Sequence, residues 1–215
     1  MIGPVLKKTL AWLGITRDLA WFDRRIQLEK QEIIAIPIGA KLKVSEQFYQ
    51  IEAPIGDVYS AYIRAKPADL WPKKWIVFHF LLLPNSTERK NAAQYPCPLP
   101  IGSRVFVELL CRPLHRWLRL MVGVQVTELS HNHSLRYDYL EGSVTMGYNR
   151  IQFTEFIREN GTVYTQIHHY SEYLGTSALL RIIMPFFQKS LHVGFVDALH
   201  SGMKNTIELQ SDTCC

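Results

Sequence analysis

Residues 183–207 read IMPFFQKSLHVGFVDALHSGMKNTI, and this stretch decides the fold. Large apolar side chains recur at every fourth position, which places them on one face of an α-helix. The row consists of Ile183, Phe187, Leu191, Phe195, Leu199, Met203 and Ile207. We therefore predict an amphipathic helix within residues 175–210. Its main part should start near Pro185, because proline disfavours a helical conformation in the residue before it.

A second row of the same helix contains only small residues: Ser190, Gly194, Ala198 and Gly202. Glycine inside a helix costs about 1 kcal/mol relative to alanine, so two glycines in one row need a structural reason. One interpretation is close packing of the helix against a sheet. The other is that the row leaves space for a bound molecule. Both interpretations place a sheet against this helix.

The chain before the helix supplies strands for such a sheet. Residues 105–109, 122–126, 135–139 and 150–157 show the alternation that is typical of half-buried strands. Asn160-Gly161 predicts a type I′ turn that leads into a further strand over residues 163–173.

Residues 75–83 (WIVFHFLLL) form an apolar run that ends at Pro84. Their length and their β-branched and aromatic content favour a buried strand. Two alternatives remain open, a lid over a cavity and a patch that dips into a membrane surface. The second alternative rests on the tryptophan and lysine residues beside the run, which suit a membrane interface.

The first strand begins near Val44 and runs to Pro54, which suits the start of a short helix. Asp57 lies in the first turn of that helix, where a negative charge is favourable. Val58, Tyr59 and Tyr62 share one side of it. This strand, Ala-Pro and short-helix sequence resembles the opening of the helix-grip superfamily, which includes START-like, polyketide-cyclase-like and pollen-allergen-like proteins.

The resemblance covers about residues 45–210 and rests mainly on the order of the elements. It implies an α+β fold in which a curved antiparallel sheet wraps around a long C-terminal helix, with a cavity between them. Residues 137–151 (YDYLEGSVTMGYNRI) are also similar to a motif of an uncharacterised branch of this superfamily, Tyr-Gly-Thr-Leu-Pro-Gly-His followed by Gly-Glu-x-Arg-Phe. The matching residues are Tyr137, Leu140, Gly142, Gly147 and Arg150.

Two positions of that motif differ in this chain. Ser143 stands where the branch has histidine, and Tyr148 stands where it has glutamate. Any role of those two family residues is therefore not transferred.

The expected domains are an N-terminal helical extension over residues 1–43, a helix-grip ligand-binding domain over residues 44–210 and a tail over residues 211–215. The apolar stripe in the first thirty residues is that of a helix packed on the domain, and an interfacial membrane helix is the alternative. The stretch after Lys7-Lys8 is too short for a signal peptide. No uncharged run is long enough to span a membrane. We therefore expect a cytoplasmic protein, with peripheral membrane contact as an open alternative.

Composition argues against several functional classes. The four cysteines include no Cys-x-x-Cys pair, and the eight histidines have no acidic or cysteine residue at ligand spacing, so no metal site or cofactor is expected. Net charge is +5, but the basic residues are scattered, which disfavours nucleic-acid binding. The sequence leaves the oligomeric state open.

The expected function is binding of a hydrophobic or amphipathic small molecule, or a lipid, in a cavity between sheet and helix. One alternative is a polyketide-cyclase-like enzyme that uses His168 or His169 as acid or base with a tyrosine donor. The other is a peripheral membrane protein that uses residues 1–30 and 71–83. No catalytic residue is assigned. The predicted ligand-binding residues are Tyr137, Tyr139, Arg150, Gln152, His169, Tyr170, Phe187, Leu191, Gly194 and Ala198.

Overall fold

A computed structural model describes residues 32–66, 76–92, 95, 99–110, 119–178, 180–182 and 192–212. The chain has an α+β architecture in which all eight described strands precede the long C-terminal helix. In chain order the elements are β1 (Lys43–Ile51), α3 (Ile55–Arg64), β2 (Ile76–Leu82), β3 (Lys90–Asn91), β4 (Arg104–Leu110), β5 (Arg119–Ser130), β6 (Ser134–Tyr139), β7 (Thr145–Ile157), β8 (Val163–Gly175) and α6 (Val193–Asp212).

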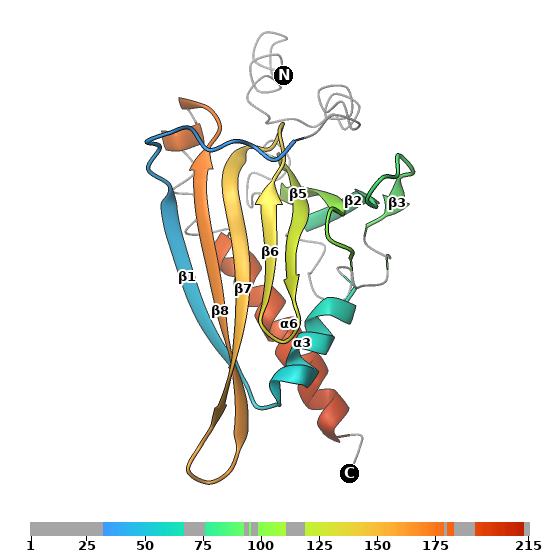
Figure 1. Cartoon of the computed structure of the whole chain (residues 1–215), viewed down its shortest axis with the longest axis vertical. Coiled ribbons are helices and arrows are strands. Elements are labelled where there is room, and N and C mark those ends of the chain that lie inside the picture. Colours follow the sequence, from blue (N-terminus) through green and yellow to red (C-terminus); the bar gives the residue numbers. More distant parts are fainter. Residues whose placement is uncertain are drawn as a thin grey trace.

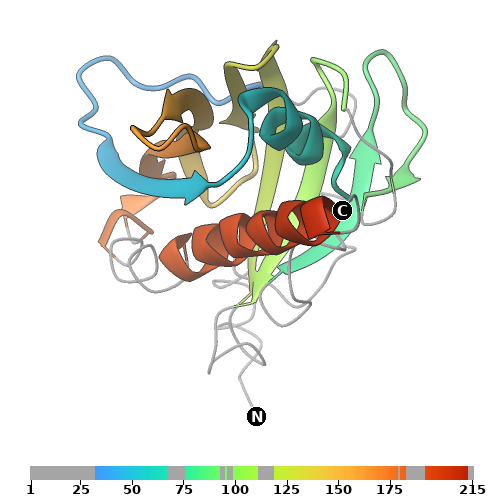
Figure 2. The same ribbon diagram turned by 90° about the horizontal axis from the view of Figure 1, so that it is seen from below.

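The strands form one sheet in the order β1-β8-β7-β6-β5-β4-β2-β3, and each neighbouring pair is antiparallel. The sheet curves around α6, which lies across its concave side (Figure 1). Seen from below, α3 lies beside α6 on that same side of the sheet (Figure 2). The predicted arrangement of a curved sheet around a C-terminal helix is confirmed.

The apolar row of the C-terminal helix packs against the sheet. Leu199, Met203 and Ile207 are buried in one cluster with Ile151 and Ile167 of the sheet. Burying a side chain of this size contributes about 1.5–3 kcal/mol, so these residues hold α6 on the sheet. Phe195 packs against a second apolar cluster nearer the start of α6. The N-terminal half of the predicted row, with Ile183, Phe187 and Leu191, lies outside the described residues.

The short helix after β1 forms as predicted. Pro54 occupies the N-cap position with φ −60°, and Asp57 lies in the first turn. Val58, Tyr59 and Tyr62 are buried, and all three pack in the same cluster as the α6 row. This packing brings the phenol of Tyr62 to the side of the sheet that faces α6.

The hairpin between β7 and β8 is confirmed, but its turn is not the type predicted. The Arg158 N–H donates to the Thr162 carbonyl at 3.0 Å, and the Gly161 N–H donates to the Arg158 carbonyl at 2.8 Å. Within the described loop, Gly161 alone has a positive φ, at +82°. A three-residue loop that ends in one left-handed glycine therefore closes the hairpin, whereas type I′ needs two residues with positive φ.

The apolar run at residues 76–82 is strand β2, which pairs with β4 on one side and with β3 on the other. The strand interpretation is confirmed for these residues, and Trp75 lies outside the described ones. No helix in the described residues is long and apolar enough to cross a membrane.

The predicted helix of the N-terminal extension falls in residues 1–31, which the structure does not describe. Residues 32–42, which it does describe, run past the end of β6 without helical turns. Ile33 forms an isolated bridge to Leu140, and the Ile34 N–H donates to the Tyr139 carbonyl at 3.0 Å.

Several residues of the 137–151 motif have structural roles in the corner between β6 and β7. Leu140 is fully buried, and the Ser143 hydroxyl bonds both backbone groups of Gly123, at 2.9 and 3.0 Å. Gly147 has φ +117°, and a Cβ there would collide with the backbone carbonyl of Glu172. Only glycine fits at that point, because the two strands approach too closely for a side chain.

Candidate functional site

The two faces of the sheet differ in character, and β8 shows this most clearly. Its buried residues are odd-numbered, from Thr165 to Gly175, and its even-numbered residues are half-buried. Ile167 packs with Leu199 of α6, so the odd-numbered side chains point toward the helix. We call this side the inner face and the opposite side the outer face.

Polar side chains gather on the inner face close to the start of α6. They come from β1, α3, β7, β8 and α6, so the fold assembles them from distant parts of the chain. We call this group the inner polar cluster. Its members are Gln47, Tyr49, Tyr62, Asn149, His169, Ser171, His192 and His200.

One hydrogen-bonded chain in the cluster runs from α3 through α6 to β8. The Tyr62 hydroxyl bonds Nδ1 of His200, and Nε2 of His200 lies 3.0 Å from Nδ1 of His169. His169 and His200 are 5% and 2% exposed. Tyr49 stacks on the His200 ring at 4.0 Å between centroids, and its hydroxyl donates to Asp197 Oδ1 at 2.5 Å. These contacts fix the orientation of both imidazole rings.

A second chain surrounds His192, the residue directly before α6. Its Nε2 lies 3.3 Å from both Ser171 Oγ and Asn149 Oδ1. The Ser171 hydroxyl donates to Asn149 Oδ1 at 2.7 Å, and Asn149 Nδ2 donates to the Tyr139 hydroxyl at 2.9 Å. The His192 and His169 rings are 5.9 Å apart between centroids and almost perpendicular, at 85°.

Three buried polar atoms of the cluster have no hydrogen-bond partner in the described part of the chain. They are Gln47 Nε2, His169 Nε2 and His192 Nδ1, and we call them the open polar atoms. Gln47 and His169 are direct neighbours across the β1–β8 pair. A buried polar group without a partner costs about 1–3 kcal/mol, so three in one place are unusual for a site with a purely structural role.

The histidines of the cluster are uncharged at neutral pH. Burial lowers the pKa of His192 to about 4 and that of His200 to about 3. Burial, and secondarily the nearby His200, also holds the pKa of His169 well below its usual range. Burial raises the pKa of the Tyr62 phenol well above its ordinary value, so this group keeps its proton. The cluster therefore offers neutral hydrogen-bonding groups rather than charges.

Some of the residues predicted for ligand binding lie on the inner face. His169 and Tyr139 belong to the hydrogen-bonded chains described above, and Tyr137 packs partly buried against the apolar cluster under α6. Gly194 and Ala198 lie half-buried on α6. Phe187 and Leu191 lie outside the described residues.

Three other predicted residues, Arg150, Gln152 and Tyr170, lie on the outer face. They alternate with inward-facing Ile151 and His169, and successive side chains of a strand point to opposite faces. Arg150 Nη2 lies 3.0 Å from Glu128 Oε2, and the Tyr170 hydroxyl donates to Glu172 Oε1 at 2.5 Å. We leave these three residues out of the candidate site, because they face away from α6.

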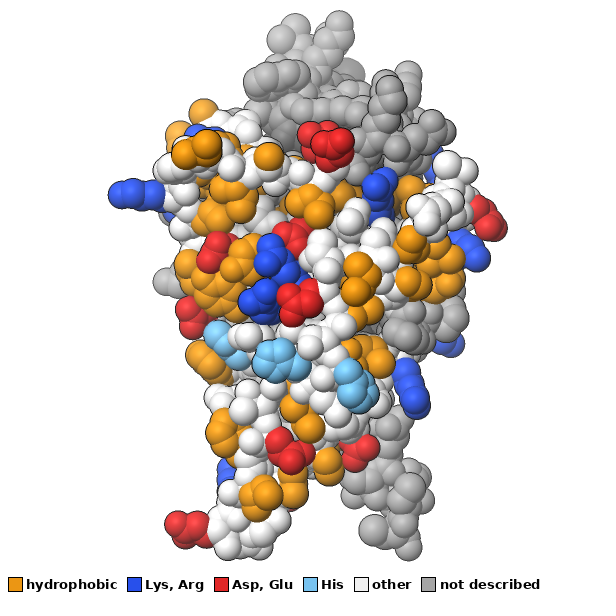
Figure 3. Space-filling model, in the orientation of Figure 1, with side chains coloured by type: hydrophobic (Ala, Val, Ile, Leu, Met, Phe, Trp, Pro, Cys, Tyr) orange, Lys and Arg blue, Asp and Glu red, His pale blue; other side chains and the backbone are white. Residues whose placement is uncertain are grey.

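The outer face carries its own polar side chains. In Figure 3 basic, acidic and histidine side chains gather over the middle of the sheet, between hydrophobic ones. Arg136 Nη2 lies 2.8 Å from Asp138 Oδ1, and the Arg136 guanidinium lies 4.1 Å from the centroid of the Tyr148 ring. His168, the other histidine considered as an acid or base, stacks on Phe48 of this face at 4.4 Å. These contacts pair several outer side chains with one another. Arg150 Nε and His168 Nε2 are nevertheless buried on this face without a hydrogen-bond partner among the described residues.

Sequence reasoning missed His192, His200 and most of their partners. A usable signal was present, since His192, Val196 and His200 follow one another at four-residue steps. This row runs beside the apolar row of the helix, and Val196 and His200 are both buried. The partners Asn149 and Ser171 carry no such signal, because only the fold brings them to the helix.

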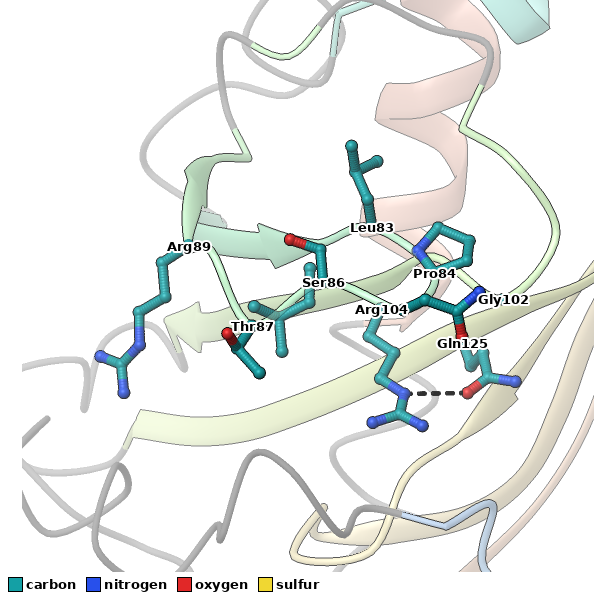
Figure 4. A pocket seen from close by; sticks show the side chains of 10 residues that line it. Leu83, Pro84, Ser86, Thr87, Arg89, Gly102, Arg104 and Gln125 are labelled. Atoms are coloured by element: carbon teal, nitrogen blue, oxygen red, sulfur yellow. Dashed lines mark hydrogen bonds between the residues drawn. The ribbon is translucent and has the colours of Figure 1, made fainter.

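A separate pocket of about 510 Å³ lies near the turn between β2 and β3 (Figure 4). Its polar residues include Ser86, Thr87 and Arg89 from the turn, and Arg104 Nε donates to Gln125 Oε1 at 3.1 Å in its wall. None of the described residues that were predicted for ligand binding lines it. Among the residues that the structure describes, no group of three or more histidine, cysteine, aspartate or glutamate side chains is arranged to hold a metal ion.

Known structures resemble this chain in fold. A point mutant of norcoclaurine synthase from Thalictrum flavum, in complex with a transition-state analogue, matches with a TM-score of 0.55 and 12% identity, over 81% of this chain and 99% of that one. The same enzyme in complex with dopamine and hydroxybenzaldehyde matches at 0.51 and 13%, over 83% and 96%. A protein from Thermus thermophilus matches at 0.53 and 10%, over 79% and 99%.

The chain has the helix-grip fold. Sequence identities this low establish the fold alone and give no information on a reaction or a ligand. No protein-family model and no curated protein sequence matches the chain. The likeness of residues 137–151 to a motif of one uncharacterised helix-grip branch stays a prediction.

Proposed function

We propose that this helix-grip protein binds a hydrophobic or amphipathic small molecule between the inner face of the sheet and α6. The observation that carries the proposal is the set of open polar atoms on His169, His192 and Gln47. A ligand that forms hydrogen bonds with these atoms would offset the cost of burying them without partners.

The surroundings of the inner polar cluster suit the apolar part of such a ligand. Two apolar clusters adjoin the inner polar cluster. Ile151, the direct neighbour of His169 across the β7–β8 pair, belongs to the cluster with Ile167 and Leu199, and Tyr139, which bonds Asn149, belongs to the cluster against which Phe195 packs. A mostly apolar site with a few polar groups gives affinity through burial and orientation through hydrogen bonds.

The structures of similar fold support a small-molecule role. Norcoclaurine synthase, which shares the helix-grip fold, has been seen with dopamine and hydroxybenzaldehyde, two small aromatic molecules. The fold can therefore enclose a ligand of that size. Nothing in the similarity transfers that enzyme's chemistry to this chain, because only 13% of the residues are identical.

Binding is favoured over acid–base catalysis by the charge state of the cluster. An effective general base has a pKa near the working pH, and so does an effective general acid. The pKa values of His192 and His200 are lowered to about 4 and about 3, and that of His169 is also strongly lowered. At neutral pH these rings are weak bases and carry no proton to donate as imidazolium.

Mass spectrometry of an organic extract of the purified full chain tests the proposal. We expect a small apolar molecule that is absent from an extract of an unrelated protein prepared in the same way. If the extract contains no such molecule, a fluorescence titration of the protein with the uncharged dye Nile red is the second test. A protein that yields an empty extract and leaves the fluorescence of the probe unchanged would contradict the proposed function.

A further inference from the structure

The hydrogen-bond partners of His200 determine which nitrogen of His169 carries the proton. A neutral imidazole has one donor and one acceptor nitrogen. If Tyr62 donates to Nδ1 of His200, then Nε2 of His200 donates to Nδ1 of His169, and Nε2 of His169 carries the proton. The reverse direction would leave the buried Tyr62 proton without an acceptor. The first arrangement satisfies more groups, so the open atom of His169 is a donor.

The same reasoning assigns the opposite role to His192. Ser171 gives its proton to Asn149 Oδ1, so both oxygens near His192 Nε2 present lone pairs to that nitrogen. Nε2 of His192 is therefore the protonated nitrogen, and Nδ1 is a bare acceptor. The amide orientation of Asn149 that this requires is the one in which Nδ2 donates to Tyr139.

The open polar atoms thus comprise donors on His169 and Gln47 and one acceptor on His192. A hydroxyl group has the matching set, since its oxygen accepts two hydrogen bonds and donates one. The His169 and His192 rings lie 5.9 Å apart between centroids, so one small ligand can reach both.

We propose that the ligand presents a neutral hydroxyl group to the inner polar cluster, which accepts from His169 Nε2–H and donates to His192 Nδ1. This inference rests on the proposed function and narrows its ligand to hydroxylated apolar molecules, such as phenols and apolar alcohols. A carboxylate is disfavoured because its lone pairs face the bare nitrogen of His192, and an ammonium because its protons face the N–H of His169. Either ion also loses its hydration in this buried site.

Four naphthalene probes test the inference by isothermal titration to the full chain. These are naphthalene, 2-naphthol, 2-methoxynaphthalene and 2-naphthoate, which share one apolar ring system and differ in the polar group. We expect 2-naphthol to bind at least tenfold more tightly than 2-methoxynaphthalene, whose oxygen accepts but cannot donate. We also expect 2-naphthoate to bind more weakly than 2-naphthol.

The variant His192→Leu removes the acceptor and should bring the ratio of the naphthol and methoxynaphthalene affinities close to one. His168→Leu, on the outer face, is the matched control and should keep the wild-type ratio. Equal affinities for these two probes in the wild type would overturn the inference, as would an unchanged ratio in His192→Leu or tightest binding of 2-naphthoate. If His192→Leu does not fold, the wild-type comparison alone decides. Failure of all four probes to bind would instead count against the proposed function itself.

Discussion

His169 Nδ1 lies 3.0 Å from His200 Nε2, so the last strand of the sheet and the C-terminal helix are joined by two buried imidazoles. The Tyr62 hydroxyl extends this link to α3 through Nδ1 of the same His200 ring. One side chain therefore holds together three elements that are far apart in sequence. The same link leaves a single donor of His169 open toward the proposed ligand.

Replacing His200 with leucine should lower the free energy of unfolding by about 2 kcal/mol or more. The change leaves the buried hydroxyl of Tyr62 and Nδ1 of His169 without a hydrogen-bond partner. Each buried polar group without a partner costs about 1–3 kcal/mol of stability. Urea denaturation followed by circular dichroism measures the loss. His168→Gln is the control, because His168 pairs with half-exposed Glu46 on the outer face, and we expect a loss below about 1 kcal/mol. Equal losses in the two variants would show that the buried contacts of His200 contribute no more to stability than the outer contact of His168 with Glu46.

Stability should fall as the pH drops from about 6.5 toward 4. In the unfolded chain a histidine has a pKa of about 6.5, whereas burial lowers the pKa of His192 to about 4 in the folded protein. The unfolded state therefore binds more protons in this window, so stability is complete above the unfolded pKa and is lost as the pH falls toward the folded one. Each such histidine contributes a slope of up to about 1.4 kcal/mol per pH unit.

The measurement is the midpoint of urea unfolding between pH 7 and pH 5 for the wild type and for His192→Leu. The variant lacks one buried histidine, so its stability should change less with pH than that of the wild type. Parallel curves for the two proteins would mean that His192 is not buried as a neutral ring.

Two glycines with positive φ should respond very differently to substitution by alanine. At Gly147 a Cβ would collide with the backbone carbonyl of Glu172, so Gly147→Ala should cost about 3 kcal/mol or more. At Gly161 a Cβ meets nothing within 4 Å, so Gly161→Ala should cost only about 1–2 kcal/mol for the left-handed conformation. Thermal melts of both variants compare the costs. A larger loss at Gly161 than at Gly147 would contradict the close approach of β7 and β8.

Much of the fold was predictable because it depends on local patterns. The apolar row from Phe195 to Ile207 fixes the buried face of α6, and strand alternation predicts β4 to β8. The turn at Gly161 shows the limit of such patterns. The Asn-Gly pair correctly marks a hairpin, but the number of residues in the loop decides the turn type.

The candidate site was less predictable, since alternation along a strand does not reveal which parity faces the helix. Arg150 and Tyr170 are as plausible as His169 in the sequence, yet they face the outer side. The contacts of His169 with His200, and of Ser171 with His192, join residues 31 and 21 positions apart. Only the curvature of the sheet around α6 brings such pairs together.

Enlarging Ala198 to leucine tests whether the small-residue row of α6 borders ligand space. If it does, the variant should keep its stability or gain some, while its affinity for 2-naphthol falls. Tight packing of the row against the sheet predicts the reverse, a loss of about 1–3 kcal/mol from overpacking. A thermal melt beside a naphthol titration separates the two outcomes. Lower stability with unchanged naphthol binding would remove Gly194 and Ala198 from the proposed site.

The central claim is that a small molecule binds against His169 and His192 on the inner face of the sheet. Nitrogen-15 NMR of the histidine rings and the backbone amides, recorded on the uniformly labelled full chain with and without 2-naphthol, tests it most directly. The account predicts that naphthol shifts the resonances of His169 Nε2 and His192 Nδ1 and leaves those of His168 in place. Binding of naphthol that shifts only His168, or only the backbone signals of Arg104 and Gln125 beside the separate pocket, would contradict it.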